Sequence, residues 1–279
     1  MKLIADSGST KTDWCVLDGG RVVERMAGQG INPFQQSRTI IRKIITYDVV
    51  SKISCAGAID EIYFYGAGCR EEMKPMMREI FSECFCNVSN VNTDTDMLAA
   101  AQALFADKPG IACILGTGSN SCMYDGEKII GNVPPLGYIL GDEGSGAVLG
   151  KLFVNAMFKG GLSAEVRDEY LRESGLTLAD IINKVYREPL PNRFLAGMSL
   201  FVYRHLDDED VRHLVVDNFR NFFRCNIALY GRPGYSVGCV GSMAYYYEHQ
   251  LAEAARLEGF EVAKVLKSPI DGLIAYHSR

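Results

Sequence analysis

One pattern of strands and turns occurs twice in this 279-residue chain, and it limits the possible folds more than any other feature. The segments "KLIADSGSTKTDWCVLDGGRVV" (2–23) and "IACILGTGSNSCMYDGEKII" (111–130) each predict a strand, a glycine turn, a strand, an Asp-Gly turn and a strand. Gly8-Ser9 corresponds to Gly118-Ser119, and Asp18-Gly19 corresponds to Asp125-Gly126 in a shorter second hairpin. A chance match of two turn motifs is the alternative. We expect a duplicated α/β fold with a cleft between its halves.

The duplication predicts a domain boundary near the segment "ADKPG" (106–110), which has the proline, glycine and charges of a linker. A chain of this length is also expected to hold about two domains. We therefore expect an N-terminal domain at 1–107 and a C-terminal domain at 108–279, with the final residues free to pack back on the first domain.

Between the two hairpins, strand-like and helix-like segments alternate. Apolar residues at helical spacing predict a helix within 36–52, and "EIYFYGAGC" (61–69) predicts a buried strand that ends in a glycine loop. Residues 70–85 have a helical composition with Pro75 near the first turn. Residues 92–105 are expected to begin a further helix.

The second half is predicted to be mainly helical over 146–230. Residues 234–260 then predict a final strand, a glycine turn and an amphipathic helix. Alternating strands and helices of this kind are typical of an α/β fold.

Composition and net charge indicate which classes of binding partner the chain can have. The chain is 48% hydrophobic and 23% charged, as in ordinary globular proteins, and its formal charge of −5 argues against non-specific nucleic-acid binding. No apolar run approaches the roughly 20 residues that cross a bilayer, and the first residues lack the features of a signal peptide. We expect a cytoplasmic protein that acts on a small molecule, with no nucleic-acid or membrane partner. A homodimer is left open.

The nine cysteines are scattered, and several, such as Cys113 and Cys239, lie in strand-like segments where a free thiol packs as a small hydrophobe. Cys84 and Cys86 are the only close pair. No paired C-x-x-C element accompanies them, so a zinc or iron–sulfur site lacks its usual pattern. Scattered cysteines without a pairing pattern are typical of proteins in a reducing compartment. The roles of Cys69 and of the Cys84/Cys86 pair stay open.

Glycine-rich turns recur at predicted strand ends, in "DSGSTKT", "YGAGC", "LGTGSNS", "LGDEGSG" and "GCVGS". Ligands of α/β folds gather at the carboxyl edges of strands, so these turns favour a nucleotide cleft. The Walker and G-x-G-x-x-G patterns are absent, which argues against a P-loop NTPase and a Rossmann dehydrogenase. Taken alone, "DSGSTKTDW" (6–14) fits a plain hairpin turn and an anion pocket equally well.

The set "DSGSTKTDW", "TDMLAAAQAL", "LGTGSN", "GYILGDEGSG" and "GCVGS" resembles the N-acetylglucosamine kinase and BadF/BcrA-type ATPase family of the actin–hexokinase–Hsp70 superfamily. The resemblance runs from residue 3 to about residue 275. It implies two ribonuclease-H-like (actin-like ATPase) domains that flank a nucleotide cleft. It also implies transfer of the γ-phosphoryl group of ATP, with Mg²⁺, to an amino-sugar hydroxyl, first of all the 6-hydroxyl of N-acetylglucosamine.

The resemblance implies roles for the residues of the glycine turns. Asp6 would hold Mg²⁺ through water, which suits a lone carboxylate beside phosphates. The groups expected to approach the phosphates or the adenosine are Gly8, Ser9, Thr10 and Lys11 in the first loop, Gly116, Thr117, Gly118 and Ser119 in the second, and Gly241 and Ser242 at the adenosine end. A solvated hairpin residue is an equal alternative for Lys11.

Asp96 is the expected catalytic base, because the family places this carboxylate just before a helix of the type D-x-x-x-A. A carboxylate at a helix N-terminus is stabilised by the dipole and free N–H groups and should stay ionised at neutral pH. It could then accept the proton of a substrate hydroxyl. A plain helix cap is the alternative for Asp96. Asp94 competes with it both as the base and as a cap of the same helix, for which Thr95 is a further candidate.

Sugar recognition needs carboxylates and amides that bind several hydroxyls. The resemblance implies this role for Asn32 in "GINPF", for Asn120, and for Asp142 with Glu143 in "LGDEGSG". Capping of the following helix is the alternative for the Asp-Glu pair.

Two departures from relatives favour a kinase. The activator ATPases carry a Gly-Gly-Gln-Asp element and cluster cysteines, whereas the second loop here is "GTGSN". Repressor relatives carry a zinc-binding cysteine cluster that is not visible here. An ATPase that activates a partner enzyme, and a sensing module without turnover, remain as alternatives.

Overall fold

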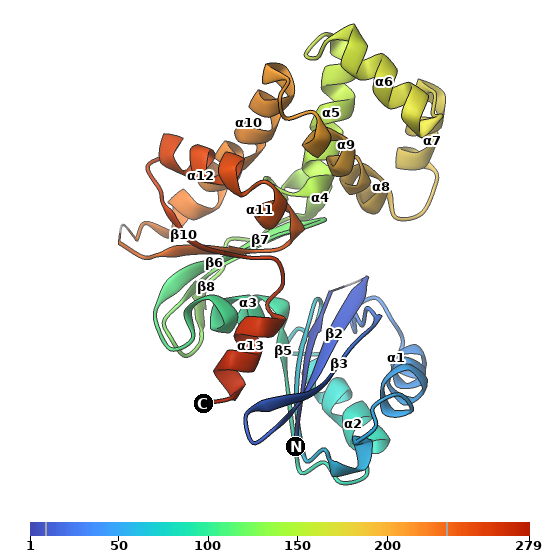
Figure 1. Cartoon of the computed structure of the whole chain (residues 1–279), viewed down its shortest axis with the longest axis vertical. Coiled ribbons are helices and arrows are strands. Elements are labelled where there is room, and N and C mark those ends of the chain that lie inside the picture. The colour runs from blue at the N-terminus through green and yellow to red at the C-terminus, as the bar shows by residue number, and fades with distance from the viewer. Residues whose placement is uncertain (9, 233) are drawn as a thin grey trace. The chain divides into compact units, whose positions relative to one another are not determined.

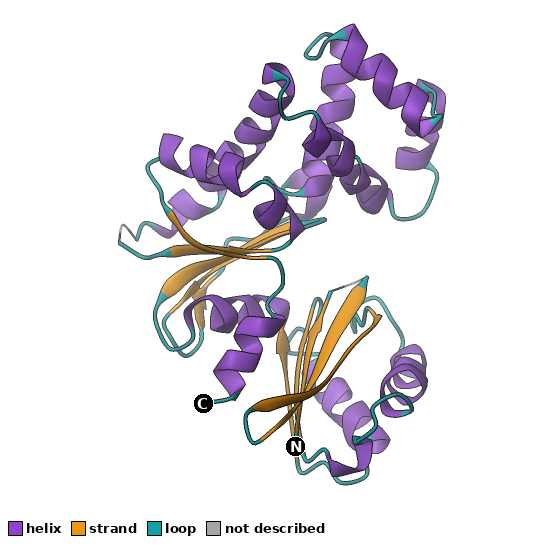
Figure 2. Ribbon diagram, viewed as in Figure 1, coloured by secondary structure: helices purple, strands orange, loops and turns teal. Residues whose placement is uncertain are grey.

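The computed structural model describes residues 1–8, 10–232 and 234–279 (Figure 1). The described residues form two compact units. The first contains Met1–Lys108, Gly126–Lys128 and Ser268–Arg279, and the second contains Pro109–Asp125 and Ile129–Lys267. Each unit has one five-stranded sheet with helices packed against it (Figure 2), so the predicted α/β class with a duplicated plan is confirmed.

The sheet of the first unit has the strand order β3-β2-β1-β4-β5. Its strands are β1 (Lys2–Ser7), β2 (Lys11–Asp18), β3 (Arg21–Gln29), β4 (Glu61–Gly66) and β5 (Asn90–Thr95). The short turns make β1, β2 and β3 antiparallel neighbours, whereas β1, β4 and β5 run parallel and are joined by helical crossovers. The carboxyl ends of β1, β4 and β5 therefore meet at one edge of the sheet.

Both faces of this sheet are covered. The helices of the first unit are α1 (Arg38–Ile44), which continues as a π-helical turn (Ile45–Val50), a 3₁₀ turn (Ala56–Ala58), α2 (Lys74–Cys84), α3 (Asp96–Phe105) and α13 (Ile270–His277). Trp14 and Phe64 project toward α1 and α2 and pack with Phe81. On the other face, α3 and α13 lie against each other and against β1 (Figure 1).

The contact between α3 and α13 requires a glycine. A Cβ placed at Gly272 would lie 2.6 Å from both the Cβ and the carbonyl oxygen of Ala103. Because carbon atoms do not approach backbone oxygen so closely, any side chain at this position would push the two helices apart.

The sheet of the second unit repeats the same plan. Its strands are β6 (Gly110–Leu115), β7 (Ser119–Tyr124), β8 (Ile129–Gly131), β9 (Val237–Val240) and β10 (Val262–Leu266). The order is β10-β9-β6-β7-β8, with antiparallel β6, β7 and β8 and parallel β6, β9 and β10. Each strand thus has a counterpart at the same position of the first sheet, which confirms that the two hairpins belong to a repeated fold.

The second unit differs from the first by a long helical insertion between β8 and β9, in the region expected to be helical. The insertion comprises α4 (Gly137–Leu140), α5 (Gly146–Lys159), α6 (Ala164–Ser174), α7 (Leu178–Tyr186), α8 (Pro191–Gly197), α9 (Ser199–Arg204), α10 (Glu209–Cys225) and a 3₁₀ turn (Ile227–Tyr230). Two further helices, α11 (Ser242–Tyr246) and α12 (Glu248–Leu257), follow β9. Phe153, Phe219, Phe222 and Phe223 are fully buried in this unit.

Some elements were not predicted. The helix expected within 92–105 exists as α3 and begins at Asp96, but residues 90–95 before it form β5, which was missed. The segment "NVNTDT" is polar and only half-buried, and its strand conformation comes from parallel pairing with β4 rather than from local propensity. The strand β10 was also missed. The helix predicted within 36–52 exists, but it changes to π-helical geometry after Ile44.

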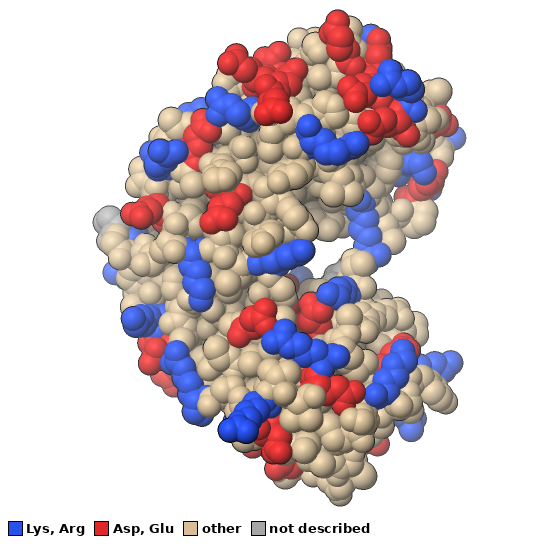
Figure 3. Space-filling model, viewed as in Figure 1, with Lys and Arg blue, Asp and Glu red and all other residues tan. Residues whose placement is uncertain are grey.

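Within the described residues, no helix combines the length and the apolar character needed to cross a membrane. Acidic and basic side chains are interspersed over the face shown in Figure 3. 

Candidate functional site

The first glycine turn is a hairpin that joins β1 to β2. Gly8 N–H donates to the carbonyl of Lys11 at 2.9 Å, and both Gly8 and Thr10 are exposed. The Lys11 ammonium lies 2.6 Å from an Asp13 oxygen and is more than half exposed. Ser9 lies outside the described residues. The turn is therefore a true hairpin whose exposed backbone would still be accessible to an anion.

Carboxylates crowd around this hairpin. Asp6 lies near the end of β1 and pairs with Asp13 across the β1–β2 ladder. Burial, together with the negative charges of Asp96 and Asp13, raises the pKa of Asp6 to about 7. The Ser268 hydroxyl donates to Asp6 at 3.4 Å and favours the ionised form.

Asp96 is the first residue of α3, and Thr95 rather than an aspartate caps the helix by accepting from Leu98 N–H at 3.3 Å. The Asp96 carboxylate accepts hydrogen bonds from its own N–H and from that of Met97. Burial outweighs these bonds and raises the pKa of Asp96 to about 6. Burial therefore affects the pKa of Asp96 more than its hydrogen bonds at the helix terminus do, and a pKa of about 6 leaves the carboxylate mostly ionised at pH 7.

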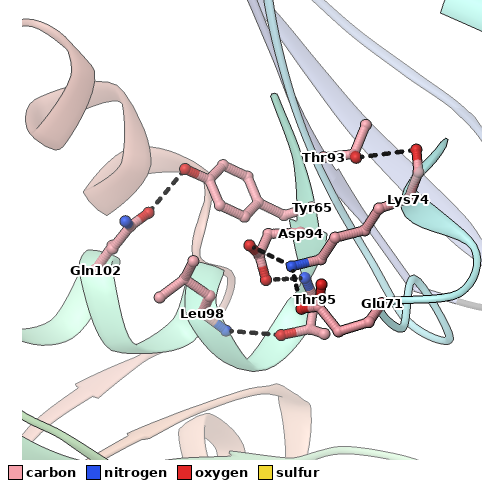
Figure 4. Close-up of polar contacts among 8 residues, drawn as sticks. All are labelled: Tyr65, Glu71, Lys74, Thr93, Asp94, Thr95, Leu98 and Gln102. Carbon is pink, nitrogen blue, oxygen red and sulfur yellow. Dashed lines mark hydrogen bonds and ion pairs between the residues drawn. The ribbon is translucent and has the colours of Figure 1, made fainter. Parts of the chain in front are cut away.

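Asp94 belongs to β5 and does not cap α3, so that expectation was wrong. One Asp94 oxygen lies 2.8 Å from the ammonium of Lys74, and the other accepts from Thr95 N–H at 2.8 Å (Figure 4). Lys74 is buried and also contacts Glu71. Burial opposes the charge of Lys74, but the bonds to Asp94 and Glu71 prevail and raise its pKa. The Asp94 carboxylate thus forms an ion pair with Lys74.

Asn32 is held beside the glycine loop that follows β4. Its side-chain oxygen accepts from Phe34 N–H at 3.1 Å. A Cβ at Gly68, which has φ +75°, would lie 2.2 Å from this oxygen, so only glycine leaves room for the amide. The hydroxyl of Ser7 exchanges hydrogen bonds with the backbone of Ile31 and fixes the preceding loop to the hairpin.

In the second unit, the loop 116–119 is tied to the start of α5. The carbonyls of Gly116 and Thr117 accept from the N–H groups of Gly146 and Ala147, at 2.8 and 3.1 Å. Asp142 is the charged group that faces this loop, because its carboxylate accepts from the N–H of Ser119. Burial raises the pKa of Asp142 to about 6.

Glycine is required where Asp142 meets the loop, since a Cβ at Gly118 would lie 2.9 Å from the Asp142 oxygen. The helix cap is Ser145, which accepts from Val148 N–H, so the alternative that Asp142 and Glu143 merely cap α5 was wrong. Asn226 donates to Glu143 at 3.3 Å. 

The remaining predicted residues of this unit lie near the same sheet. Gly241, at φ +115°, approaches β6 so closely that a Cβ there would lie 2.3 Å from the Leu115 oxygen. Ser242 begins α11 directly after it. The Asn120 side-chain oxygen accepts from Ser121 N–H and from the amide of Asn132, so it is already engaged.

Because β6 and β9 are parallel neighbours, the loop 116–118 and Gly241 lie at one edge of the second sheet. The described predicted residues therefore fall into two groups. Asp6, Gly8, Thr10, Lys11, Asn32 and Asp96 belong to the first unit, and those from Gly116 onward belong to the second.

The crowded carboxylates of the first unit suit a divalent cation. The pKa of Asp6 is raised partly by Asp96 and Asp13, and a bound cation would relieve this repulsion. Among the described residues, no group of three His, Cys, Asp or Glu side chains is arranged to hold a metal directly. The donor set therefore fits a cation that is held mainly by waters and phosphates.

Several supporting residues could not be recognised from sequence. Asp13 lies within the first motif, but only the strand register places it opposite Asp6. Ser268 is far away in the sequence and carries no motif. Buried Asn218 of α10 accepts from Gly144 N–H and donates to the Ser145 carbonyl, which fixes the "GDEGS" turn.

Similar solved structures were found, although no protein-family model and no curated protein matches the chain. A crystal structure of a "Putative N-acetylglucosamine Kinase" from Porphyromonas gingivalis is 48% identical, with a TM-score of 0.97, and the match covers 100% of this chain and 99% of that one.

Two more distant structures share the fold alone. A protein with the same description from Chromobacterium violaceum is 16% identical, with a TM-score of 0.75 over 99% of this chain and 98% of that one. A ROK-family glucokinase from Streptomyces griseus, solved with glucose and AMPPNP, is 15% identical, with a TM-score of 0.59 over 98% and 97%.

Proposed function

Since the chain belongs to the N-acetylglucosamine kinase family, a group of carbohydrate kinases with the actin-like ATPase fold, we propose that it transfers the γ-phosphoryl group of Mg-ATP to the 6-hydroxyl of N-acetylglucosamine. The observation that carries this proposal is the environment of Asp96. It is a partly exposed carboxylate at the start of a helix, with a pKa of about 6 and within electrostatic range of Asp6.

Asp96 acts as the general base. The pKa of a base works best near the operating pH, and a value of about 6 leaves it ionised but able to take a proton. The sugar oxygen forms a bond to the γ-phosphorus while the bond from that phosphorus to the β,γ-bridging oxygen breaks. The hydroxyl proton goes to Asp96, and ADP leaves.

Asp6 and the glycine loops bind the nucleotide. Mg²⁺, when bound with ATP, neutralises the phosphate charge, and Asp6 would hold it through water. We assign the phosphates to Gly8, Ser9, Thr10 and Lys11 of the first loop and to Gly116, Thr117, Gly118 and Ser119 of the second, and the adenosine to Gly241 and Ser242. The exposed backbone of the first turn supports this assignment.

The sugar is assigned to Asn32, Asn120, Asp142 and Glu143. Gly68 leaves room for the Asn32 amide, and Gly118 leaves room for the Asp142 carboxylate. Glycine at these two positions supports recognition by side chains that are fixed before the sugar binds. We also propose the division of the chain into domains at 1–107 and 108–279, with the final residues packed back on the first domain, since Ser268–Arg279 belong to the first compact unit.

The substrate is tested with a coupled assay of ADP release. The purified protein is supplied with Mg-ATP and, separately, with N-acetylglucosamine, glucosamine, N-acetylmuramic acid or glucose. We expect the largest kcat/KM with N-acetylglucosamine. A larger value with another sugar would contradict the assigned substrate, and negligible release with every sugar despite ATP binding would contradict the kinase mechanism.

A further inference from the structure

A cavity lies in the first unit, along the edge strand β5, and none of the described residues proposed for ATP or sugar lines it. Its volume is about 430 Å³, within the roughly 300–1,000 Å³ usual for small-molecule sites. Arg78 of α2, Asn92 of β5 and Gln102 of α3 line it, together with rings from β4 and α13.

A buried amide faces this cavity with an unused donor. Gln102 is 8% exposed, and its side-chain oxygen accepts from the Tyr65 hydroxyl at 2.7 Å. Figure 4 shows the amide nitrogen on the side away from Tyr65. Within the described part of the chain this nitrogen has no hydrogen-bond partner, and it is not among the buried unpaired atoms, so it is accessible from the cavity. It is therefore free to donate to a hydrogen-bond acceptor of a ligand.

The charge at the cavity is positive. Arg78 forms no ion pair with any residue that the structure describes, whereas Asp94 is paired with Lys74. His277 is neutral at pH 7, because burial and the nearby charge of Lys2 lower its pKa to about 4 against the opposing charge of Glu61. Of the charged groups at the cavity, the guanidinium of Arg78 is therefore the one that is available to pair with an anionic ligand.

Aromatic rings supply the apolar part of the wall. The ring of Tyr63 lies 4.1 Å from that of His277, and the ring of Tyr276 lies 5.1 Å from His277, measured between centroids. The His277 ring is fixed by its contact with the Tyr65 hydroxyl at 3.0 Å. Such rings offer flat apolar faces against which the C–H side of a sugar ring can pack.

We propose that this cavity binds a carbohydrate anion, a sugar phosphate or a sugar acid. Its anionic group lies on Arg78, its hydroxyls accept from Gln102 and Asn92, and its ring packs beside Tyr63 and Tyr276. The same helix that contributes Gln102 begins with Asp96, so a bound anion would contact α3 two turns from the proposed base. 

Isothermal titration calorimetry on the full chain tests the proposal, with glucose 6-phosphate and glucuronate as probes and with glucose and inorganic phosphate for comparison. The titrations are repeated with saturating N-acetylglucosamine and ADP, which occupy the proposed active site. We expect at least one of the two charged sugars to bind once per chain with unchanged affinity in both conditions and more tightly than glucose. The stronger of the two identifies the anion as phosphate or carboxylate.

Arg78→Gln and Gln102→Leu should each weaken this binding by about tenfold, as expected for loss of a charge-assisted or buried hydrogen bond. Arg42→Gln on α1, which also removes an exposed guanidinium, and Asn32→Ala should not. Arg78 is exposed, so its variant is expected to fold. Absence of binding by both charged sugars would overturn the proposal, as would equal binding of glucose. So would binding that Asn32→Ala abolishes and Arg78→Gln preserves.

Binding at this cavity is independent of phosphoryl transfer. A protein without kinase activity could still bind the anion, and an active kinase could lack the site, so the two proposals fail separately.

Discussion

Two aspartates that stand two residues apart have different tasks in this account. Asp96→Asn removes the base and should lower kcat by roughly 10²–10⁴-fold, because proton acceptance matters mainly in the transition state. The KM for ATP should change little. Steady-state kinetics with Mg-ATP and N-acetylglucosamine measure both constants.

Asp94→Asn is the matched control, since it makes the same chemical change in a neighbouring carboxylate. It removes a partner of buried Lys74 and should lower the free energy of unfolding by about 1–3 kcal/mol, with kcat close to wild type. Urea unfolding measures the first quantity. An exchange of the two phenotypes would assign the base to Asp94.

Replacing Asp6 by a neutral residue should stabilise the protein at high pH but not at low pH. The pKa of Asp6 is about 7 in the folded chain and close to 3.8 when unfolded, so the folded chain binds more protons between these values and loses stability as the pH rises through them. Asp6→Asn, which is always neutral, should therefore melt at a higher temperature than wild type at pH 8 and at nearly the same temperature at pH 4.

These melting curves are recorded with EDTA and without nucleotide. Asp18→Asn, at the exposed end of β2, serves as the control and should match wild type at both pH values. A lower melting temperature for Asp6→Asn at pH 8 would show that Asp6 is not destabilised by its neighbours.

At the residue scale, the sequence indicates which side chains are candidates for the chemistry, but not how the fold shifts their pKa values. Asp6 and Asp142 stand out because glycines surround them. Their raised pKa values depend on burial and on neighbours such as Asp13, which only the folded register brings close.

At the scale of elements, the close contact of α3 with α13 makes its own prediction. Gly272→Ala places a methyl group against Ala103, and such overpacking typically costs 1–3 kcal/mol. Gly197→Ala at the end of α8 is the control, because a Cβ there meets nothing within 4 Å. Thermal unfolding should show a lower melting temperature for the first variant alone. Equal values would mean that the helices separate without cost.

Hairpins were predictable at this scale, and β5 was not. Asp-Gly turns and apolar alternation are local signals, so β1–β2–β3 and β6–β7 could be recognised in the sequence. The polar strand β5 has no such signal, because its conformation depends on pairing with β4. The requirement for glycine at position 272 likewise could not be predicted, because it depends on the contact with Ala103 of another helix.

At the scale of the whole molecule, the duplication was visible in the sequence because the two hairpins retain the same turn residues. The structure extends the repeat to all five strands of each sheet, including β9 and β10, which share no turn motif with β4 and β5. Whether the two units face each other across a cleft stays a prediction. Among the residues that the structure describes, the first unit has no counterpart of the helical insertion of the second.

The proposed function is transfer of the γ-phosphoryl group of ATP to a sugar hydroxyl. Phosphorus-31 NMR of the protein with Mg-ATP and N-acetylglucosamine measures this directly, as sugar phosphate formed per ADP released. We expect one N-acetylglucosamine 6-phosphate for each ADP, with negligible ADP when the sugar is left out. Release of ADP and inorganic phosphate without any sugar phosphate would contradict it and would indicate an ATPase instead.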